Sequence, residues 1–252
     1  MDPRLRERAI LDEVLQGNLP TFLRRLVPVT FTDTLGGLAP AAVIFVMPDY
    51  LAIGSDDDFL RMPMNLETAT AVAARFGFVL PTRKIVDAIY AQSAFRFVPE
   101  PLTPGPHMRS TEYYRLHNEI IGQQARAGGV SLGTLVSGHK KDVVVTNRLA
   151  STPGRIAIYG WHRPSGDPIQ PLSTVHGACY ADYSHGIRLV SQLAWQKGTL
   201  RSVRDILQDP FSAHVLSDEG AIRPVFAGLV QAAGTADTLI PGFCSSGIQD
   251  GN

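Results

Sequence analysis

The sequence predicts an α+β fold, organised as a single domain with a mainly antiparallel sheet, flanking helices and an N-terminal helical extension. Segments with helical spacing are interspersed with short apolar runs rich in β-branched residues, and turn residues separate them. The 18 prolines and the charged content of 18% are typical of a loop-rich domain rather than a helical bundle. A chain of 252 residues is also long enough to bury a large core.

Three regions are expected within this domain of residues 1–252. Residues 1–28 form the helical extension, and residues 29–127 form strands with their covering helices. Residues 128–252 form the β region that carries the candidate site, together with C-terminal helices. No internal repeat divides the chain further.

Helices are predicted where apolar residues recur with helical spacing between a start signal and a stop signal. Asn65 and Ser110 are suitable N-caps, Gly17 and Gly77 are stop signals, and Pro81 suits a first helical turn. The predicted helices cover residues 3–15, 21–26, 66–76, 82–93, 111–127, 191–197 and 199–207.

Strands are predicted at short apolar runs bounded by glycine, proline and aspartate. Residues 55–58 and 164–167 are expected to form turns. The three aspartates of the first turn favour an exposed hairpin over a calcium site, because the EF-hand spacing is absent. Residues 95–106 contain four prolines and predict an extended connection. The predicted strands cover residues 29–32, 42–47, 50–53, 132–136, 142–146, 155–159 and 187–190.

Composition argues against two classes of partner. The formal net charge is zero and no long lysine-arginine block occurs, so a nucleic-acid partner is not expected. No window approaches the ~18 consecutive apolar residues of a membrane span, so a membrane partner is not expected either. The N-terminal residues lack the apolar core of a secretory signal, which predicts a cytoplasmic protein. Cys179 and Cys244 carry no disulfide framework, and their pairing stays open.

The segment from Gly138 to Arg188 is the expected functional site, because it concentrates reactive side chains in an otherwise weakly charged chain. Each histidine taken alone is explained more simply as a hydrogen-bonded structural residue, and His117 outside the segment is interpreted that way. The candidate catalytic residues are His139, Asp142, His176, Cys179, Asp182, Ser184 and His185.

Nucleophilic catalysis is the first mechanism that these residues suggest. Ser184 and Cys179 are the available nucleophiles, and Asp142 or Asp182 is available to orient a histidine base. Neighbours in a strand point to opposite faces, so Ser184 is expected to pair with His176 or His139 and Cys179 with His185.

One short stretch resembles a known signature. His176-Gly177 followed by Ser184-His185-Gly186-Ile187-Arg188 is similar to the histidine-glycine and serine-histidine-glycine-cysteine-isoleucine-arginine motif of L,D-transpeptidases, which acylate a cysteine while cross-linking peptidoglycan. The likeness covers about fourteen residues. Ile187 stands directly after Gly186, where that family has its cysteine, and the gap between the two halves is short. We therefore carry over neither the family's fold nor its activity.

A zinc site is the alternative mechanism. His139, His176 and His185 supply ligands of the kind that leaves a catalytic zinc one open position, although their spacing matches no helical zinc motif. Lys141 and Arg188 are the expected contacts for an anionic substrate group, with Arg188 alternatively paired to Asp182 as a structural ion pair. Trp161 and His162 are expected to form a rim on which a substrate stacks.

The sequence thus predicts a hydrolase or acyl-transferase that acts on an amide or ester bond of a small-molecule or peptide substrate without a cofactor. A zinc-dependent amidase or peptidase is the second hypothesis. A non-catalytic protein that binds an anionic or sugar-like ligand is the third. All three hypotheses require that residues 138–142 and 176–188 meet in space.

Overall fold

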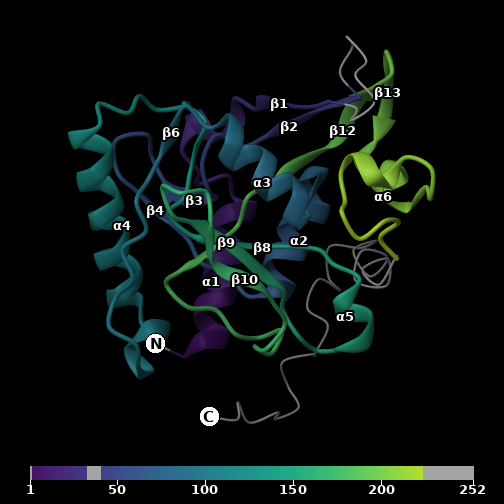
Figure 1. Ribbon diagram of the computed structural model, residues 1–252. Coiled ribbons are helices and arrows are strands. Elements are labelled where there is room, and N and C mark those ends of the chain that lie inside the picture. Colours follow the sequence, from purple (N-terminus) through teal and green to yellow (C-terminus); the bar gives the residue numbers. More distant parts are fainter. Residues whose placement is uncertain (1, 33–40, 224–252) are drawn as a thin grey trace.

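Two β-sheets lie between helices in the computed structural model, which describes residues 2–32 and 41–223 (Figure 1). The larger sheet is antiparallel throughout, with the order β1-β2-β12-β13 and with β5 paired to β12. Its strands are β1 (Val27–Phe31), β2 (Ala42–Val46), β5 (Phe78–Val79), β12 (Val190–Gln196) and β13 (Thr199–Ser202).

The smaller sheet has the order β10-β9-β8-β11, and only its β8–β11 pair is parallel. Two further pairs flank the sheets: an antiparallel β3–β4 hairpin and a parallel β6–β7 pair. These strands are β3 (Ala52–Gly54), β4 (Phe59–Arg61), β6 (Phe95–Arg96), β7 (Val136–Ser137), β8 (Lys141–Val143), β9 (Ile158–His162), β10 (Pro168–Ser173) and β11 (His185–Gly186).

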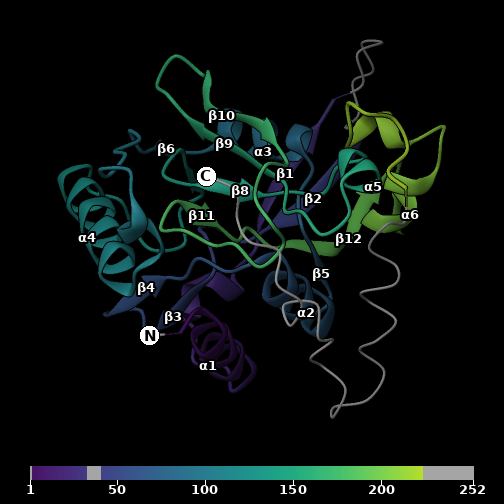
Figure 2. The same ribbon diagram turned by 90° about the horizontal axis from the view of Figure 1, so that it is seen from below.

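Helices pack around the sheets, with α4 at one end of the molecule and α6 at the other (Figure 1). The view from below shows α1 and α2 on the side opposite the β9–β10 hairpin (Figure 2). The helices are α1 (Pro3–Leu15), η1 (Thr21–Arg24), α2 (Leu66–Phe76), α3 (Arg83–Gln92), η2 (Pro106–Arg109), α4 (Thr111–Ala127), α5 (Arg148–Ser151), α6 (Val203–Gln208) and η3 (Ala213–Val215). The predicted α+β class and the N-terminal helical extension are confirmed.

Helix α3 links the cores of the two sheets because it buries residues on two faces. Ile85 and Ile89 pack with the inner face of the larger sheet, where Ile44 and Val190 lie. Val86 instead packs among residues of the smaller sheet. A separate cluster joins α1 and α2 to the strands that follow them. The two sheets are therefore held in one body.

Capping signals placed most helices correctly. The Asn65 side chain accepts a hydrogen bond from the Thr68 N–H at the start of α2, and Gly77 ends that helix at φ 72°. The Ser110 side chain caps α4 in the same way. Thr82, rather than Pro81, begins the α3 region as its N-cap. The predicted helices 3–15, 66–76 and 111–127 match α1, α2 and α4.

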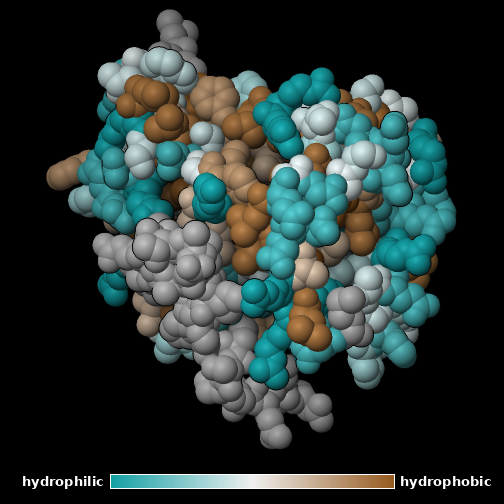
Figure 3. Space-filling view, turned by 180° about the vertical axis from the view of Figure 1, so that it is seen from behind, coloured by the Kyte–Doolittle hydropathy of each residue, from teal (hydrophilic) through white to brown (hydrophobic). Residues whose placement is uncertain are grey.

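The predicted helix over residues 191–197 is wrong, because these residues form most of β12. Lys197 (φ 48°) and Gly198 (φ 79°) make a tight turn into β13, which is the backbone conformation of a two-residue hairpin. Burial of Ala194 and exposure of Trp195 follow the strand period of two. In the space-filling view, apolar residues (brown) lie in several groups among polar residues (teal) over the face shown (Figure 3).

The predicted helix over 199–207 is half right, since β13 precedes the short helix α6. The predicted strands over 132–136 and 187–190 overlap regular strands only at their ends, and β10 was not predicted. Residues 55–58 and 164–167 do form the predicted turns, between β3 and β4 and between β9 and β10. The predicted Gly36-Gly37 turn and the irregular tail from Gly234 lie outside the described residues.

Close packing at Gly186 gives the first prediction. A Cβ atom there would lie 2.6 Å from two ring carbons of buried Tyr50 and 2.9 Å from the Cβ of buried Lys140. We expect Gly186→Ala to lower the free energy of unfolding by about 1 to 3 kcal/mol, measured by urea denaturation. Gly122→Ala is the control, because its Cβ would meet only the flexible end of Arg126 at 3.3 Å. Equal effects of the two substitutions would contradict tight packing at Gly186.

Candidate functional site

Strands β8 and β11 bring the two predicted site segments together. His185 is in register with Lys141, and Gly186 with Asp142, in a parallel pair. The Lys141 N–H donates a 2.8 Å hydrogen bond to the Ser184 carbonyl oxygen. Residues 138–142 and 176–188 therefore meet in space, as the sequence predicts. Successive side chains of a strand point to opposite faces, so the two segments supply more than one cluster.

The first cluster surrounds Asp182. The backbone N–H and the hydroxyl of Ser184 both donate to Asp182 Oδ1, at 2.8 and 2.5 Å. The Tyr180 hydroxyl donates to Oδ2 at 3.2 Å. Ser184 thus bonds to a carboxylate, and the predicted pairing of Ser184 with His176 or His139 is not found.

His185 lies beside this carboxylate and is completely buried. Neither of its ring nitrogens has a hydrogen-bond partner among the described residues. Its ring centre is 5.7 Å from that of Tyr180 and 6.4 Å from that of His176. Tyr180 and His176 stack on each other with ring centres 4.0 Å apart and are only partly buried. The partly buried His176–Tyr180 stack is therefore a neighbour of the fully buried His185 ring.

The charges in this cluster follow from burial and from neighbouring groups. Burial lowers the pKa of His185 to about 4, although Asp182 opposes the shift. Burial alone would raise the pKa of Asp182, but His185, Lys141 and the Ser184 hydrogen bonds hold it below its usual value. At neutral pH a neutral imidazole therefore lies beside an ionised carboxylate.

His139 lies in a different cluster, which corrects its assignment as a base for Ser184. Its Nε2 atom is 2.9 Å from Asp49 Oδ1, and its ring contacts the rings of Tyr50 and Phe97 edge-on. Burial lowers the pKa of His139 to about 4, with Asp49 opposing the shift. The imidazole is thus committed to a buried contact away from Ser184.

Asp142 is also part of this second cluster, so it does not orient a histidine near Ser184. Its Oδ2 atom accepts a 2.8 Å hydrogen bond from the Tyr50 hydroxyl. Burial raises the pKa of Asp142 to about 6, although the nearby Arg188 guanidinium opposes the shift.

Arg188 donates its hydrogen bonds to backbone carbonyl oxygens. It is therefore neither the expected contact for an anionic substrate group nor the expected ion-pair partner of Asp182. The side chain is completely buried. Its Nη1 and Nη2 atoms donate to the carbonyl oxygens of Met47 (3.0 Å) and Val136 (2.7 Å). Its guanidinium carbon lies 4.3 Å from the centre of the Tyr50 ring. These contacts give Arg188 a structural role.

Trp161 and His162 do not form a substrate rim, because both are almost fully buried on β9. His162 Nε2 lies 3.0 Å from Asp87 Oδ1, and its ring stacks on Tyr90. Lys141, the other expected substrate contact, is partly buried with its Nζ 5.4 Å from the centre of the Trp161 ring.

Cys179 is not a free thiol in this structure, so it is not available as a nucleophile here. Cys244 lies outside the described residues. The zinc hypothesis receives no geometric support, because His139 is in a different cluster from His176 and His185. Within residues 2–32 and 41–223, no three His, Cys, Asp or Glu side chains are placed to hold a metal.

Sequence reasoning missed a buried lysine. Lys140 Nζ donates to the Tyr183 carbonyl oxygen at 2.6 Å and lies 3.4 Å from His117 Nδ1. Burial, together with Arg61, lowers the pKa of Lys140 to about 7. Lys140 adjoins predicted residues on both sides, but nothing in its sequence context indicates that a lysine is buried there. His117 has the hydrogen-bonded buried position that was expected.

Comparisons with protein-family models, with curated proteins and with solved structures find no match to this chain. Among the described helices, none is long and apolar enough to cross a membrane. Functional inference therefore depends on the geometry of the clusters themselves.

The lowered pKa of His185 predicts a stability change with pH. Between about pH 6.5 and pH 4 the unfolded chain binds a proton at this residue and the folded chain does not. The contribution of neutral His185 is therefore present above pH 6.5 and lost as the pH falls to about 4. The unfolding free energy of the wild type, minus that of His185→Gln, should decrease over this range by up to about 3 kcal/mol.

Urea unfolding at several pH values measures this difference. Other groups, including Asp142, titrate in the same range, but they cancel when wild type and variant are compared. His214 is exposed, so His214→Gln is the matched control for the effect of exchanging a histidine for glutamine outside the buried cluster. A pH-independent difference for His185→Gln would contradict the burial of a neutral imidazole.

Proposed function

We propose that the protein is a hydrolase or acyl-transferase acting on an amide or ester bond, with His185 as its general base. The observation that carries this proposal is the fully buried His185 ring with neither nitrogen bonded, beside Asp182. An unbonded buried polar group costs roughly 1 to 3 kcal/mol of stability. A catalytic role is one explanation for a buried polar group left in that state, and His185 differs from the other such groups in having both ring nitrogens unbonded.

The chemistry follows from a neutral imidazole. His185 takes a proton from an acceptor hydroxyl or water while the acceptor oxygen attacks the carbonyl carbon of the substrate. The imidazolium then returns the proton to the leaving amine or alkoxide as the acyl bond breaks. Water as the acceptor gives hydrolysis, and an alcohol as the acceptor gives acyl transfer.

Asp182 and Ser184 assist this proton transfer in the proposal. The Asp182 carboxylate favours the positively charged imidazolium, because opposite charges attract strongly in a buried site. The Ser184 hydroxyl donates a hydrogen bond to Asp182, so we assign Ser184 to positioning that carboxylate rather than to nucleophilic attack. In the proposal a substrate reaches His185 past the neighbouring His176–Tyr180 stack, which is only partly buried.

Substitution of His185 tests the proposal. A panel of activated esters and peptide anilides provides the assay, and His185→Gln should lower kcat/KM at least a hundredfold by removing the base. His214→Gln should keep the wild-type rate. The acid limb of the wild-type kcat/KM profile should lie near pH 4, because activity requires neutral His185 and is lost as the pH falls through its pKa.

Ser184→Ala separates the assigned roles. Loss of a positioning hydroxyl should lower kcat/KM about tenfold, whereas loss of a nucleophile would abolish turnover. An active His185→Gln variant contradicts the general-base assignment. If no substrate is turned over and His185→Gln changes only the affinity for an anionic or sugar-like ligand, the protein is a binding module.

A further inference from the structure

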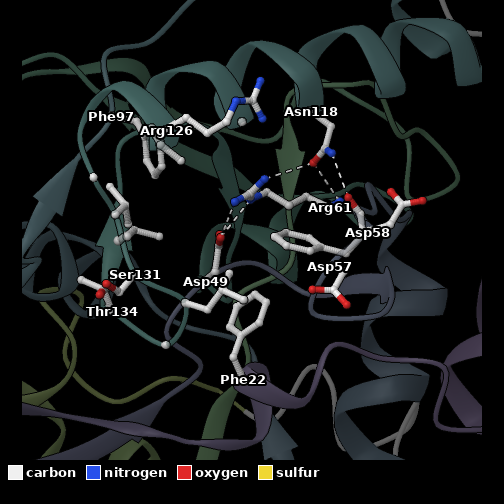
Figure 4. A pocket seen from close by; sticks show the side chains of 18 of the residues that line it. Phe22, Asp49, Asp57, Asp58, Arg61, Phe97, Asn118, Arg126, Ser131 and Thr134 are labelled. Atoms are coloured by element: carbon white, nitrogen blue, oxygen red, sulfur yellow. Dashed lines mark hydrogen bonds and ion pairs between the residues drawn. The ribbon is translucent and has the colours of Figure 1, made fainter.

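A cavity of about 360 Å³ lies between α4, the β3–β4 hairpin and the loop that precedes β7. This volume is within the range of small-ligand sites. Phe22, Phe59 and Phe97 give it an apolar lining. Asp49 and Arg61 form part of its wall, and their charges are satisfied by each other (Figure 4).

Four other charged side chains line the cavity without a partner among the described residues: Asp57, Asp58, Glu119 and Arg126. Asp57 and Asp58 lie in the β3–β4 turn, whereas Glu119 and Arg126 lie on α4. Figure 4 shows Arg126 well apart from Asp57 and Asp58, with Arg61 between them. The cavity therefore has opposite charges in separate places and an apolar lining.

Helix α4 carries the two opposite charges Glu119 and Arg126 on one face, and they form no ion pair with each other. Glu119 and Arg126 are seven residues apart, so they share a face and their Cα atoms are separated by roughly 10 Å. Gly122 and Ala125 lie between them and line the cavity with little or no side chain. The guanidinium of Arg126 lies over Gly122, with Nη1 3.3 Å from where a Cβ would be. The Arg126 guanidinium therefore lies on the side of Arg126 that faces Glu119, above the small residues of this helix face.

The geometry points to a binding site for a short peptide with free ends. Its ammonium group would lie near Asp57, Asp58 and Glu119, its carboxylate would pair with Arg126, and an apolar side chain would contact the phenylalanine rings. An arginine fork pairs with a carboxylate through two parallel hydrogen bonds, so Arg126 specifies the carboxyl end. This site does not depend on the proposed chemistry of His185.

Isothermal titration calorimetry with the tripeptide Ala-Phe-Ala tests the site. The free peptide should bind saturably, and its N-acetylated and C-amidated forms should each bind at least about tenfold more weakly, because each loses a charge-assisted contact. In Arg126→Gln the free and C-amidated peptides should bind equally. In the double variant Asp57→Asn, Asp58→Asn, the difference in affinity between the free and the N-acetylated peptide should be smaller than in the wild type.

Two controls accompany this experiment. Arg115 is exposed on α4 and does not line the cavity, so Arg115→Gln should bind the peptide as the wild type does. His185→Gln should also bind normally, which separates this site from the proposed catalytic cluster. Thermal unfolding verifies that each variant is folded.

Three results would overturn the inference. The first is no saturable binding at millimolar peptide. The second is equal binding of free and capped peptides, which would leave the charged residues without a role. The third is tighter binding of spermidine than of the peptide, which would make this a site for cations without a carboxylate.

Discussion

The buried ion pair between Asp49 and Arg61 holds together the parts of the molecule on which both sites depend. Arg61 donates from Nε and Nη2 to Asp49 Oδ2 at 2.9 and 2.7 Å, and from Nη1 to the Asn118 side chain on α4 at 3.1 Å. His139 contacts the other carboxylate oxygen.

Burial alone would raise the pKa of Asp49, but Arg61 and His139 hold it well below its usual range. Removing one partner of such a pair costs about 3 to 5 kcal/mol, because it leaves a buried charge uncompensated. The β3–β4 hairpin, α4 and the turn before β8 are therefore fixed relative to one another.

A second buried cation extends this framework across both sheets. Arg188 follows β11 in the chain, yet it donates to the carbonyl oxygen of Met47, just after β2, and to that of Val136 in β7. The ring of Tyr50 lies against its guanidinium, and the Tyr50 hydroxyl bonds to Asp142 on β8. The Arg188 side chain thus joins the chain after β11 to the backbone after β2 and to the backbone of β7. Arg188 is three residues after His185, so these contacts fix the chain close to β11.

Much of the fold was predictable because it depends on local signals. Caps such as Asn65 and Ser110 act within three residues, so the sequence located α2 and α4. The error at β12 arose from an unrecognised Lys197-Gly198 turn, which sets strand pairing over four residues. The meeting of the two site segments was also predicted. The sequence did not predict that the side chains of these segments fall into separate clusters. That separation depends on the contact of His139 with Asp49, about ninety residues earlier, and no spacing in the sequence links the two residues.

Comparison among the buried histidines explains why His185 is singled out. His117, His139 and His162 each have a ring nitrogen within hydrogen-bond distance of another described side chain, as a structural histidine requires. His185 is as deeply buried as these three, yet both of its nitrogens are unbonded and its ionised neighbour Asp182 already accepts three hydrogen bonds. Stability alone would favour an apolar side chain of similar size at this position, because the imidazole carries the desolvation cost without a compensating bond. This cost, borne by a residue that packing does not require, is the reason that we propose a chemical role for His185.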